Sequence, residues 1–425
     1  MPFMRYNMSN NVFINGPLQD FSTKERTRTM KYDVIVAGAG PAGFAAAIGA
    51  AQAGKKVLLL DKNAGPGGVA VYCGCPVFAG MFGSHGELPP GVAGEFASRM
   101  KGRYFVSALT HLNSSEFEVG LCMTRMLREA GVEMLFYAML TAAECREGRI
   151  RSVTVSGCGN TLRLEAESFV DATGDAVLSR LAGAELLPSD PDETMTKTVL
   201  FRVSHVKNFD KPKLCELFPS LDFPYPHQDR FMGTIVGEDE ANGDVLLNLT
   251  AVSGNALDLA DLTRMDIELR EQIPVILDWM RKKLPGFEEC RLSAVAPQIG
   301  VRGSCNVKGR AVITAADLDN DTPVDEPVAM GKRSYGGHYL HQFRSPWGTG
   351  SSGYRAIPYG ALRPAGLDNL SVGGRCISIE SKAVSAVRLM PVCMATGQAA
   401  GIAAALDFPP YPVLKQELIR QGIQV

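Results

Sequence analysis

The stretch YDVIVAGAGPAGFAAAIGAAQAGKKVLLLD, residues 32–61, decides the fold. Residues 32–37 form a short apolar run that ends in glycines, as buried parallel strands do. Residues 41–53 follow a helical pattern, and Gly54 stands where a C-terminal cap glycine belongs. A second apolar run occupies residues 56–60. Strand, glycine turn, helix and strand in this order predict a right-handed βαβ unit that begins an α/β fold.

The turn between the first strand and the helix carries G-x-G-x-x-G as Gly38, Gly40 and Gly43. The first glycine makes the turn, the second lets a pyrophosphate approach the backbone, and the third lets the helix pack closely. The helix N-terminus adds N–H groups and a positive dipole end. Asp61 ends the second strand, where an acid accepts ribose hydroxyls. The pattern therefore predicts one dinucleotide site.

Bulk composition excludes several classes of protein. The net charge of −2 gives no reason to expect nucleic acid as a partner. Ten scattered cysteines favour a reducing, cytoplasmic location over a secreted disulfide scaffold. Residues 34–54 and 389–406 lack charge over a spanning length, but their Ala and Gly content makes a membrane span the weaker interpretation. Residues 1–31 are expected to be a polar lead-in without a signal-peptide core.

The residue pattern changes in the middle of the chain. Strands are predicted within residues 132–174, with turns at Glu147-Gly148 and 157–160, as a meander that returns to the main sheet. Residues 191–345 contain Pro-rich loops, a strand at 243–250 and a helix at 261–286, and are interpreted as a second domain inserted into the first. A buried strand at 367–374 and a final helix then complete the first domain.

Several of these segments resemble a known family. Residues 32–80 look like the opening of FAD-dependent oxidoreductases of the glutathione-reductase-type fold, and DATGDAVLSRLAGA (171–184) is similar to their Ala-Thr-Gly segment. APQIGVRGS (296–304) and the block from 357 to 406 resemble the branch called simply the FAD-dependent oxidoreductase family. That branch is distantly similar to fumarate reductases and to the flavin subunits of heterodisulfide reductases.

The resemblance implies an α/β architecture with FAD as cofactor. A Rossmann-like FAD-binding domain of the glutathione-reductase type would comprise residues 32–190 and 346–425, and residues 191–345 would form an inserted α+β substrate domain. The residues implied to hold FAD are Gly38, Gly40, Pro41, Ala42, Gly43, Asp61, Lys62, Gly67, Gly68, Val69, Gly174, Asp175, Gly374, Arg375, Met390 and Pro391.

Within that set, the resemblance places Gly67 and Gly68 under the ribityl chain, Gly374-Arg375 beside the pyrophosphate and Met390-Pro391 at the flavin ring. A helix that begins near Leu389 would also aim its positive end at the flavin, where it would stabilise the reduced anion and raise the reduction potential.

Cys73 and Cys75 follow the Gly67-Gly68 pair closely, so they are candidates for positions beside the reactive ring. They are either redox-active thiols, a flavin attachment point or an exchanging disulfide, or they are small residues that line a tight loop. One intervening glycine leaves little room for both thiolates on one ion, and no metal site is expected.

Four further residues are candidates for catalysis. His338 and His341 stand among aromatic residues and glycines, and either one is a candidate acid/base or a structural loop histidine. Arg302 and Arg388 lie in the matching blocks, where an arginine either clamps a substrate carboxylate, offsets charge on reduced flavin, or holds domains together.

The sequence thus predicts an FAD-dependent oxidoreductase that transfers a hydride between a small organic substrate and the flavin. The alternatives are a flavin-dependent monooxygenase, a cofactor-binding regulator without turnover, and an electron-transfer flavoprotein that serves a partner. The last of these is disfavoured because the chain has no iron–sulfur Cys-x-x-Cys run. The electron acceptor and the oligomeric state stay open.

Overall fold

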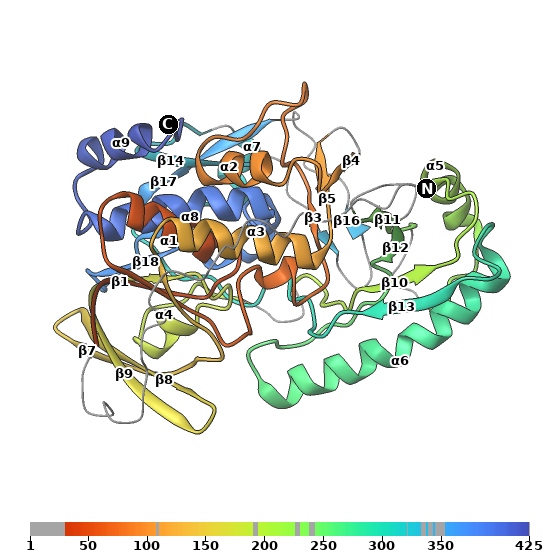
Figure 1. Ribbon diagram of the computed structural model, residues 1–425, viewed down its shortest axis with the longest axis horizontal. Helices are drawn as coiled ribbons and strands as arrows, with labels where there is room; N and C mark the ends of the chain where they lie inside the picture. The colour runs from red at the N-terminus through yellow and green to blue at the C-terminus, as the bar shows by residue number, and fades with distance from the viewer. Residues whose placement is uncertain are drawn as a thin grey trace, which may run out of the picture.

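The computed structural model describes residues 30–107, 110–189, 194–225, 230–237, 243–320, 322–332, 337–338, 343–344 and 353–424. Its main sheet has the order β6-β2-β1-β9-β8-β7, and β18 pairs with the end of β9. The strands are β1 (Met30–Ala37), β2 (Val57–Leu60), β6 (Glu133–Leu135), β7 (Met139–Arg146), β8 (Arg149–Gly157), β9 (Asn160–Asp171) and β18 (Leu370–Val372). The pairs that β1, β2, β6, β9 and β18 form among themselves are parallel. The fold is a mixed α/β architecture with a parallel, Rossmann-like sheet (Figure 1).

The βαβ prediction is confirmed. Helix α1 (Pro41–Gln52) connects β1 to β2, which pair in parallel with Val34 opposite Val57. Gly54 has a φ of 82°, as a C-terminal cap glycine requires. Alternate residues of β1 enter different cores, because successive strand residues face opposite sides of a sheet. Val34 and Val36 pack with the helices, whereas Ile35 packs with the meander and α4 (Val177–Leu181).

The predicted meander is present as β7-β8-β9, with turns at Glu147-Gly148 and Cys158-Gly159 that adopt positive φ. The sequence predicts separate strands at residues 161–168 and 169–174, and this prediction is wrong, because β9 runs unbroken from Asn160 to Asp171. The first half of β9 is largely exposed and the second half is mostly buried, because the neighbouring strands differ. The first half pairs with β8, and the second half is enclosed between β1 and β18.

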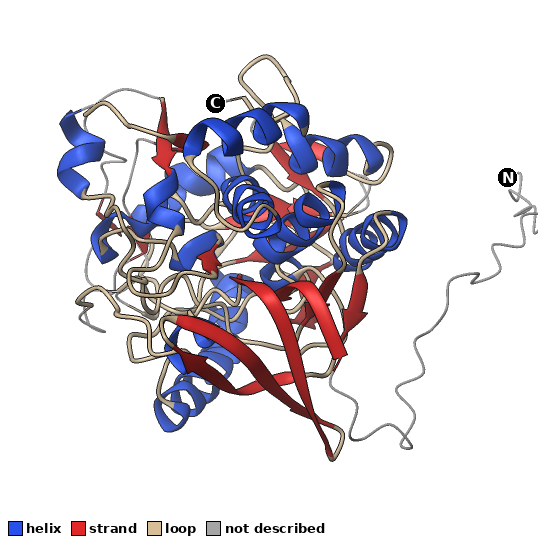
Figure 2. Ribbon diagram, turned by 90° about the vertical axis from the view of Figure 1, so that its left-hand side faces the viewer, coloured by secondary structure: helices blue, strands red, loops and turns tan. Residues whose placement is uncertain are grey.

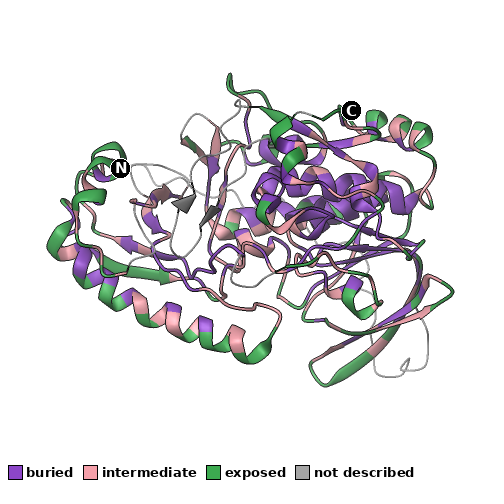
Figure 3. Ribbon diagram, turned by 180° about the vertical axis from the view of Figure 1, so that it is seen from behind, coloured by how far each residue is buried: buried purple, intermediate pink, exposed green. Residues whose placement is uncertain are grey.

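Helices α1 and α8 (Met390–Ala405) cover one face of the main sheet and lie side by side (Figures 1 and 2). A Cβ built on Gly397 would lie 2.0 Å from the carbonyl oxygen of Ala42, and one built on Gly401 would lie 2.0 Å from that of Ala46. The two backbones therefore touch. This contact explains the Ala/Gly composition of the two uncharged segments, and Figure 3 shows both helices as almost wholly buried.

Further helices lie around this pair: α2 (Gly91–Arg99), α3 (Glu116–Glu129) and α9 (Tyr411–Arg420). Helix α9 is not predicted from the sequence, because the Ala/Gly-rich segment before it is expected to be the final helix. In the part of the chain that the structure describes, no helix combines the length and the apolar character needed to cross a bilayer.

A second, antiparallel sheet has the order β11-β12-β10-β13 and its own apolar core. Its strands are β10 (Phe201–Ser204), β11 (Gly233–Val236), β12 (Asp244–Leu247) and β13 (Arg291–Val295). The long helix α6 (Leu259–Lys283) lies along it (Figure 1) and buries Met265, Leu269 and Ile273 on one side. We call this unit, β10–β13 with α6, the second-sheet region. The predicted limits of an inserted domain, 191–345, stay a prediction.

The remaining described elements are short. Strands β3 (Val77–Phe78), β4 (Phe105–Ser107) and β5 (His111–Asn113) form one small sheet. Two antiparallel pairs join β14 (Pro327–Lys332) to β17 (Tyr354–Pro358) and β15 (Gly337–His338) to β16 (Phe343–Arg344). Helices α5 (Lys211–Leu217) and α7 (Ala315–Asn320) complete the set.

Candidate functional site

At Gly38 and Gly43 the glycine turn is built by backbone contacts that leave no room for a Cβ. Gly38 has a φ of 94°, and a Cβ on it would lie 2.6 Å from the carbonyl oxygen of Ala172. A Cβ on Gly43 would lie 1.6 Å from the carbonyl oxygen of Gly38. Gly40 is the N-cap of α1 and supplies no side-chain cap, and Pro41 follows at the first helical position. The amides of this helix start are therefore available to an anion, as the motif predicts.

The Gly67-Gly68 pair lies directly against this turn. Gly67 donates its amide to the carbonyl of Ala39 at 2.8 Å, and it has a φ of 120°. A Cβ on Gly68 would lie 2.7 Å from the Cα of Gly40. Val69 follows in the short helical turn Gly68–Ala70. Two segments implied to hold FAD are therefore in backbone contact, and glycine is required at Gly68, whereas a Cβ on Gly40 would lie 3.8 Å from the Cα of Gly68.

Asp61 directly follows β2 and is buried beside the turn. One carboxylate oxygen accepts the amide of Ala39 at 2.6 Å, and the other accepts the amide of Asn63 at 2.7 Å. These bonds fix the carboxylate at the turn, and each oxygen keeps a further lone pair for a ligand hydroxyl. Lys62, the next residue, is exposed and acts electrostatically on Asp175.

The loop after β9 is shaped by a buried carboxylate. Asp171 accepts from the amide and hydroxyl of Thr173 with one oxygen, and from the amide and hydroxyl of Ser179 with the other. Gly174 adopts a φ of 78°, and a Cβ on it would lie 2.9 Å from the guanidinium carbon of Arg375. The Ala-Thr-Gly segment is thereby held against the Gly374-Arg375 turn.

Asp175 and Arg375 form an ion pair of 2.5 Å. Burial opposes ionisation of Asp175, but the charge of Arg375 and the hydroxyl of Ser304 lower its pKa below the usual value. Both side chains are surrounded by protein, yet they keep 29% and 20% of their surface accessible. They therefore line space inside the molecule instead of packing in the solid core.

The start of α8 completes the cofactor side. Gly374 donates its amide to the hydroxyl of Thr396 at 3.0 Å, and a Cβ on it would lie 3.0 Å from that of Ala42. Met390 is buried at the first position of α8, and Pro391 follows it. The segments predicted around residues 38–43, 67–69, 174–175 and 374–375 thus converge on the N-termini of α1 and α8.

Cys73 and Cys75 are free thiols on the loop that follows Gly68. Cys73 donates to the carbonyl of Ile299 at 3.3 Å. Burial raises the pKa of Cys73 to about 11 and also raises the pKa of Cys75. Both thiols are therefore protonated at neutral pH, which favours the interpretation of small residues in a tight loop over that of reactive thiolates.

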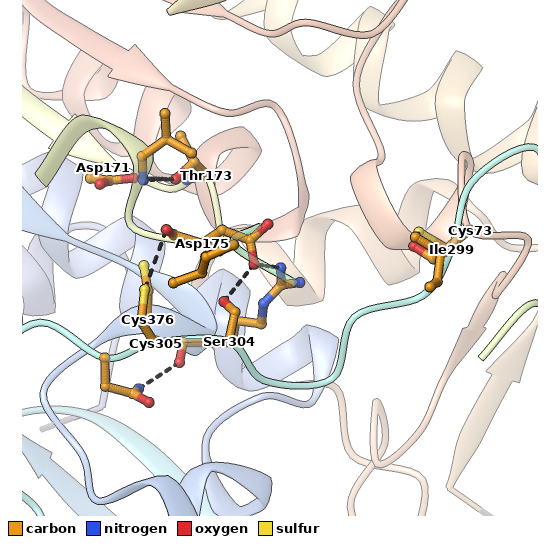
Figure 4. A network of polar contacts seen from close by, with 12 residues as sticks. Cys73, Asp171, Thr173, Asp175, Ile299, Ser304, Cys305 and Cys376 are labelled. Carbon is orange, nitrogen blue, oxygen red and sulfur yellow. Dashed lines mark hydrogen bonds and ion pairs between the residues drawn. The ribbon is translucent and has the colours of Figure 1, made fainter. Parts of the chain in front are cut away.

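Arg302 belongs to the segment Ile299–Ser304. This segment connects the second-sheet region to the loops that carry Cys73 and Asp175, which we call the cofactor loops. At one end Cys73 meets Ile299, and at the other Ser304 donates to Asp175 at 2.6 Å (Figure 4). Arg302 donates to the carbonyl of Thr196 at 2.6 Å and to Asn248 at 2.7 Å. Burial and the charge of Arg388 lower the pKa of Arg302 to about 9.

The structure says less about the remaining catalytic candidates, Arg388, His338 and His341. Arg388 acts electrostatically on Arg302 and on Cys75, so the two predicted arginines are brought together. The backbone of His338 lies in β15, but its side chain and all of His341 lie outside the described residues.

Sequence reasoning missed Lys197, Thr196, Asn248 and Ser304. Lys197 is 1% exposed, and its ammonium donates to the hydroxyl of Thr194 at 2.7 Å. A signal for Lys197 was present, because it is the one charged residue of the buried run TMTKTVLF, 194–201. The other three are polar residues whose role depends on contacts distant in sequence.

The parallel sheet, the glycine turn and the acid at the end of β2 define a dinucleotide-binding α/β protein. The model of the family described as FAD dependent oxidoreductase matches residues 33–409, which is most of the chain. The chain therefore belongs to this family, and it is an enzyme with FAD as its cofactor. The glycine cradle, the open helix N-terminus and Asp61 suit that group.

Individual relatives match shorter stretches. A digeranylgeranylglycerophospholipid reductase from Methanopyrus kandleri is 33% identical over 175 residues, which cover 38% of this chain and 41% of the relative. One of the opine oxidase subunits from Rhizobium meliloti is 49% identical over 51 residues, 12% of this chain and 10% of the relative. The chain thus spans less than half the length of these curated relatives.

Among solved structures, a geranylgeranyl bacteriochlorophyll reductase-like protein from Thermoplasma acidophilum superposes with a TM-score of 0.47 at 12% identity. The match covers 93% of this chain and 83% of that one.

Proposed function

We propose that this enzyme transfers a hydride between a small organic substrate and FAD, in the space between the cofactor loops and the second-sheet region. One observation carries the proposal. The segment Ile299–Ser304 touches the Cys73 loop and the Asp175 loop, and Arg302 lies between these two contacts in the chain. A substrate held there would face both the cofactor side and the second-sheet side of the molecule.

Residues of this chain would divide the work. Bound FAD supplies two-electron hydride chemistry. The glycine turn, Asp61 and the Gly67-Gly68 pair would hold the cofactor, and the Asp175–Arg375 pair would fix the loops around it. Arg302 would orient the substrate, because Thr196 and Asn248 hold its guanidinium in place. We also propose that residues 191–345 act as the inserted substrate domain of a glutathione-reductase-type arrangement.

The acid or base of the reaction is proposed to be His338 or His341. Either imidazole would exchange the proton that accompanies hydride transfer. Replacement of each histidine by Gln, followed by the pH profile of reduction, tests this assignment. A profile that keeps its histidine limb in both variants would refute it.

The test of the proposed function is anaerobic reduction of the purified, FAD-loaded protein by a panel of small metabolites, followed through the flavin absorbance. We expect bleaching by one chemical class of C–H donor, or reoxidation of the reduced protein by the corresponding unsaturated acceptor. One matching relative is named a reductase and another an oxidase, so the reaction is assayed in both directions.

Two other outcomes would point to a different reaction. A transient hydroperoxide absorbance, when reduced protein meets oxygen, would favour a monooxygenase. Reduction by a protein partner alone would favour an electron-transfer role. Failure of every small molecule in both directions would overturn the proposal.

A further inference from the structure

Lys197 is an unusual residue for its position. It lies in the buried segment Thr194–Thr198, where the chain passes from the core of the main sheet, which contains Met195, to that of the second-sheet region, which contains Val199. Its backbone is fixed by reciprocal hydrogen bonds with Val252 at 2.9 and 3.1 Å. A lysine with 1% exposure is rare unless it is paired.

No carboxylate in the described part of the chain forms an ion pair with Lys197. Its ammonium has three N–H donors, and the acceptor that the described residues supply is the hydroxyl of Thr194. The charged groups that act on Lys197 are Asp261 at the start of α6, Asp175 after β9, Arg302, and Arg375.

Both of those carboxylates are already neutralised by other groups. Asp261 binds Arg264 and the amide of Asn255. Asp175 binds Arg375 and Ser304. Among the described residues, the positive charge of Lys197 is therefore left without a counter-charge, and burial lowers its pKa to about 8. An unpaired buried ammonium opposes folding, because nothing replaces the water it has lost.

Arg302 shares this situation. Its guanidinium donates to the backbone carbonyl of Thr196, the residue next to Lys197, and its charge acts on the Lys197 ammonium. Its partners within the described residues, Thr196 and Asn248, are neutral. Arg302 makes the Lys197 ammonium less favourable, and Arg388 does the same to Arg302, so an anion that entered beside Lys197 and Arg302 would relieve both.

We propose that Lys197 and Arg302 together bind a carboxylate group of the substrate. This inference rests on the proposed function, since it places the substrate beside the segment Ile299–Ser304. A carboxylate is the matching group because it carries one charge and presents two oxygens, one for a guanidinium edge and one for an ammonium. The cofactor phosphates are expected at the glycine turn, where the helix amides supply their donors.

The first test measures binding to the FAD-loaded protein without turnover. Acetate, malonate and benzoate are titrated while the flavin absorbance is recorded, with acetamide, malonamide and benzamide as uncharged counterparts. We expect at least one carboxylate, and none of the amides, to perturb the spectrum. Lys197→Met should weaken that binding by about tenfold or more, since a buried charge partner is lost.

Two further variants control this result. Lys197→Arg should retain binding to within a few fold. Lys207→Met removes an exposed lysine of the second-sheet region that pairs with Glu289, and it should change nothing. The FAD content should be the same in all of these proteins. A Lys197→Met protein that loses FAD would overturn the proposal, because Lys197 would then belong to the cofactor site.

The second test is thermal unfolding of the same proteins. A lysine kept only for structure would stabilise the fold, so its removal would lower the midpoint. We expect the opposite, a higher midpoint for Lys197→Met than for the wild type. Added carboxylate should raise the midpoint of the wild type but not that of Lys197→Met.

Failure of this inference is distinguishable from failure of the proposed function. A lower midpoint with unchanged carboxylate binding, or no spectral response to any carboxylate, would overturn the carboxylate site and leave hydride transfer standing. Carboxylate binding through Lys197, in a protein that no organic substrate reduces or reoxidises, would refute the proposed function only.

Discussion

The glycine turn and the region around Lys197 and Arg302 are both suited to an anion, but they are built in different ways. Around the turn, backbone groups meet so closely that Cβ atoms are excluded, and amides are left to receive an anion. Around Lys197 and Arg302, long side chains bring positive charge into a buried place where the described residues offer them neutral partners. The first region is made by the absence of side chains and the second by their charge.

This difference teaches where each region is vulnerable. A site built from backbone contacts fails when an atom is added to it. A site built from buried charge is already unfavourable for folding, so it becomes more stable when the charge is removed. Five substitutions test this contrast, in order of decreasing effect.

The largest effect is expected for Gly397→Ala. Its new Cβ would lie 2.0 Å from the carbonyl oxygen of Ala42, so α8 would move away from the helix that carries the turn. We expect a loss of about 3 kcal/mol in the free energy of unfolding, and weaker FAD retention. Chemical denaturation and the flavin-to-protein absorbance ratio measure both. Gly120→Ala in α3, where a Cβ has 3.6 Å of room, should be neutral or stabilising.

Lys197→Met should have an effect of similar size and opposite sign. The pKa of Lys197 is about 8 in the folded protein, against an ordinary value of 10.5, so the folded state is penalised wherever the unfolded chain binds the extra proton. The penalty is absent above pH 10.5, grows as the pH falls to 8 and is complete below that. At pH 7 the variant should be more stable by about 3 kcal/mol. A difference that does not shrink between pH 8 and 10 would contradict this origin.

Asp175→Asn should destabilise the protein by about 2 kcal/mol, because it leaves Arg375 without its carboxylate. The pKa of Asp175 is lowered, so its contribution is present above the usual carboxyl value and is lost as the pH falls through the folded pKa. Urea unfolding from pH 7 down to pH 3 should therefore show the free energies of unfolding of the wild type and Asp175→Asn becoming more alike. Asp368→Asn, which breaks the exposed pair with Arg310, is the control and should change little.

The smallest effects are expected for Cys73→Ser and Cys75→Ser. Both thiols are protonated at neutral pH, and a serine hydroxyl can replace the Cys73 donor to Ile299. We expect substrate reduction rates within about threefold of the wild type, a change below about 1 kcal/mol. Mass spectrometry after acid denaturation should find the flavin detached from the wild-type chain. A flavin that remains attached would restore the covalent role.

The two regions also differ in how far the sequence predicts them. Gly38, Gly40, Gly43 and Asp61 lie within one short stretch, and local backbone geometry dictates both the residue types and their spacing. Lys197, Asn248 and Arg302 come from three separate segments, and their proximity depends on how the second-sheet region packs against the main sheet. The run around Lys197 shows that a charge is buried, but its neighbours appear only in three dimensions.

The contact between α1 and α8 also bears on how the protein is made. Helix α1 lies near the beginning of the chain, whereas its backbone partner lies close to the end. At about 5–20 residues per second, translation would take tens of seconds to deliver α8 after α1 has left the ribosome. Throughout that interval the face of α1 that α8 covers in the folded protein has no permanent partner. The FAD-binding side of the molecule can therefore be assembled only after α8 has left the ribosome.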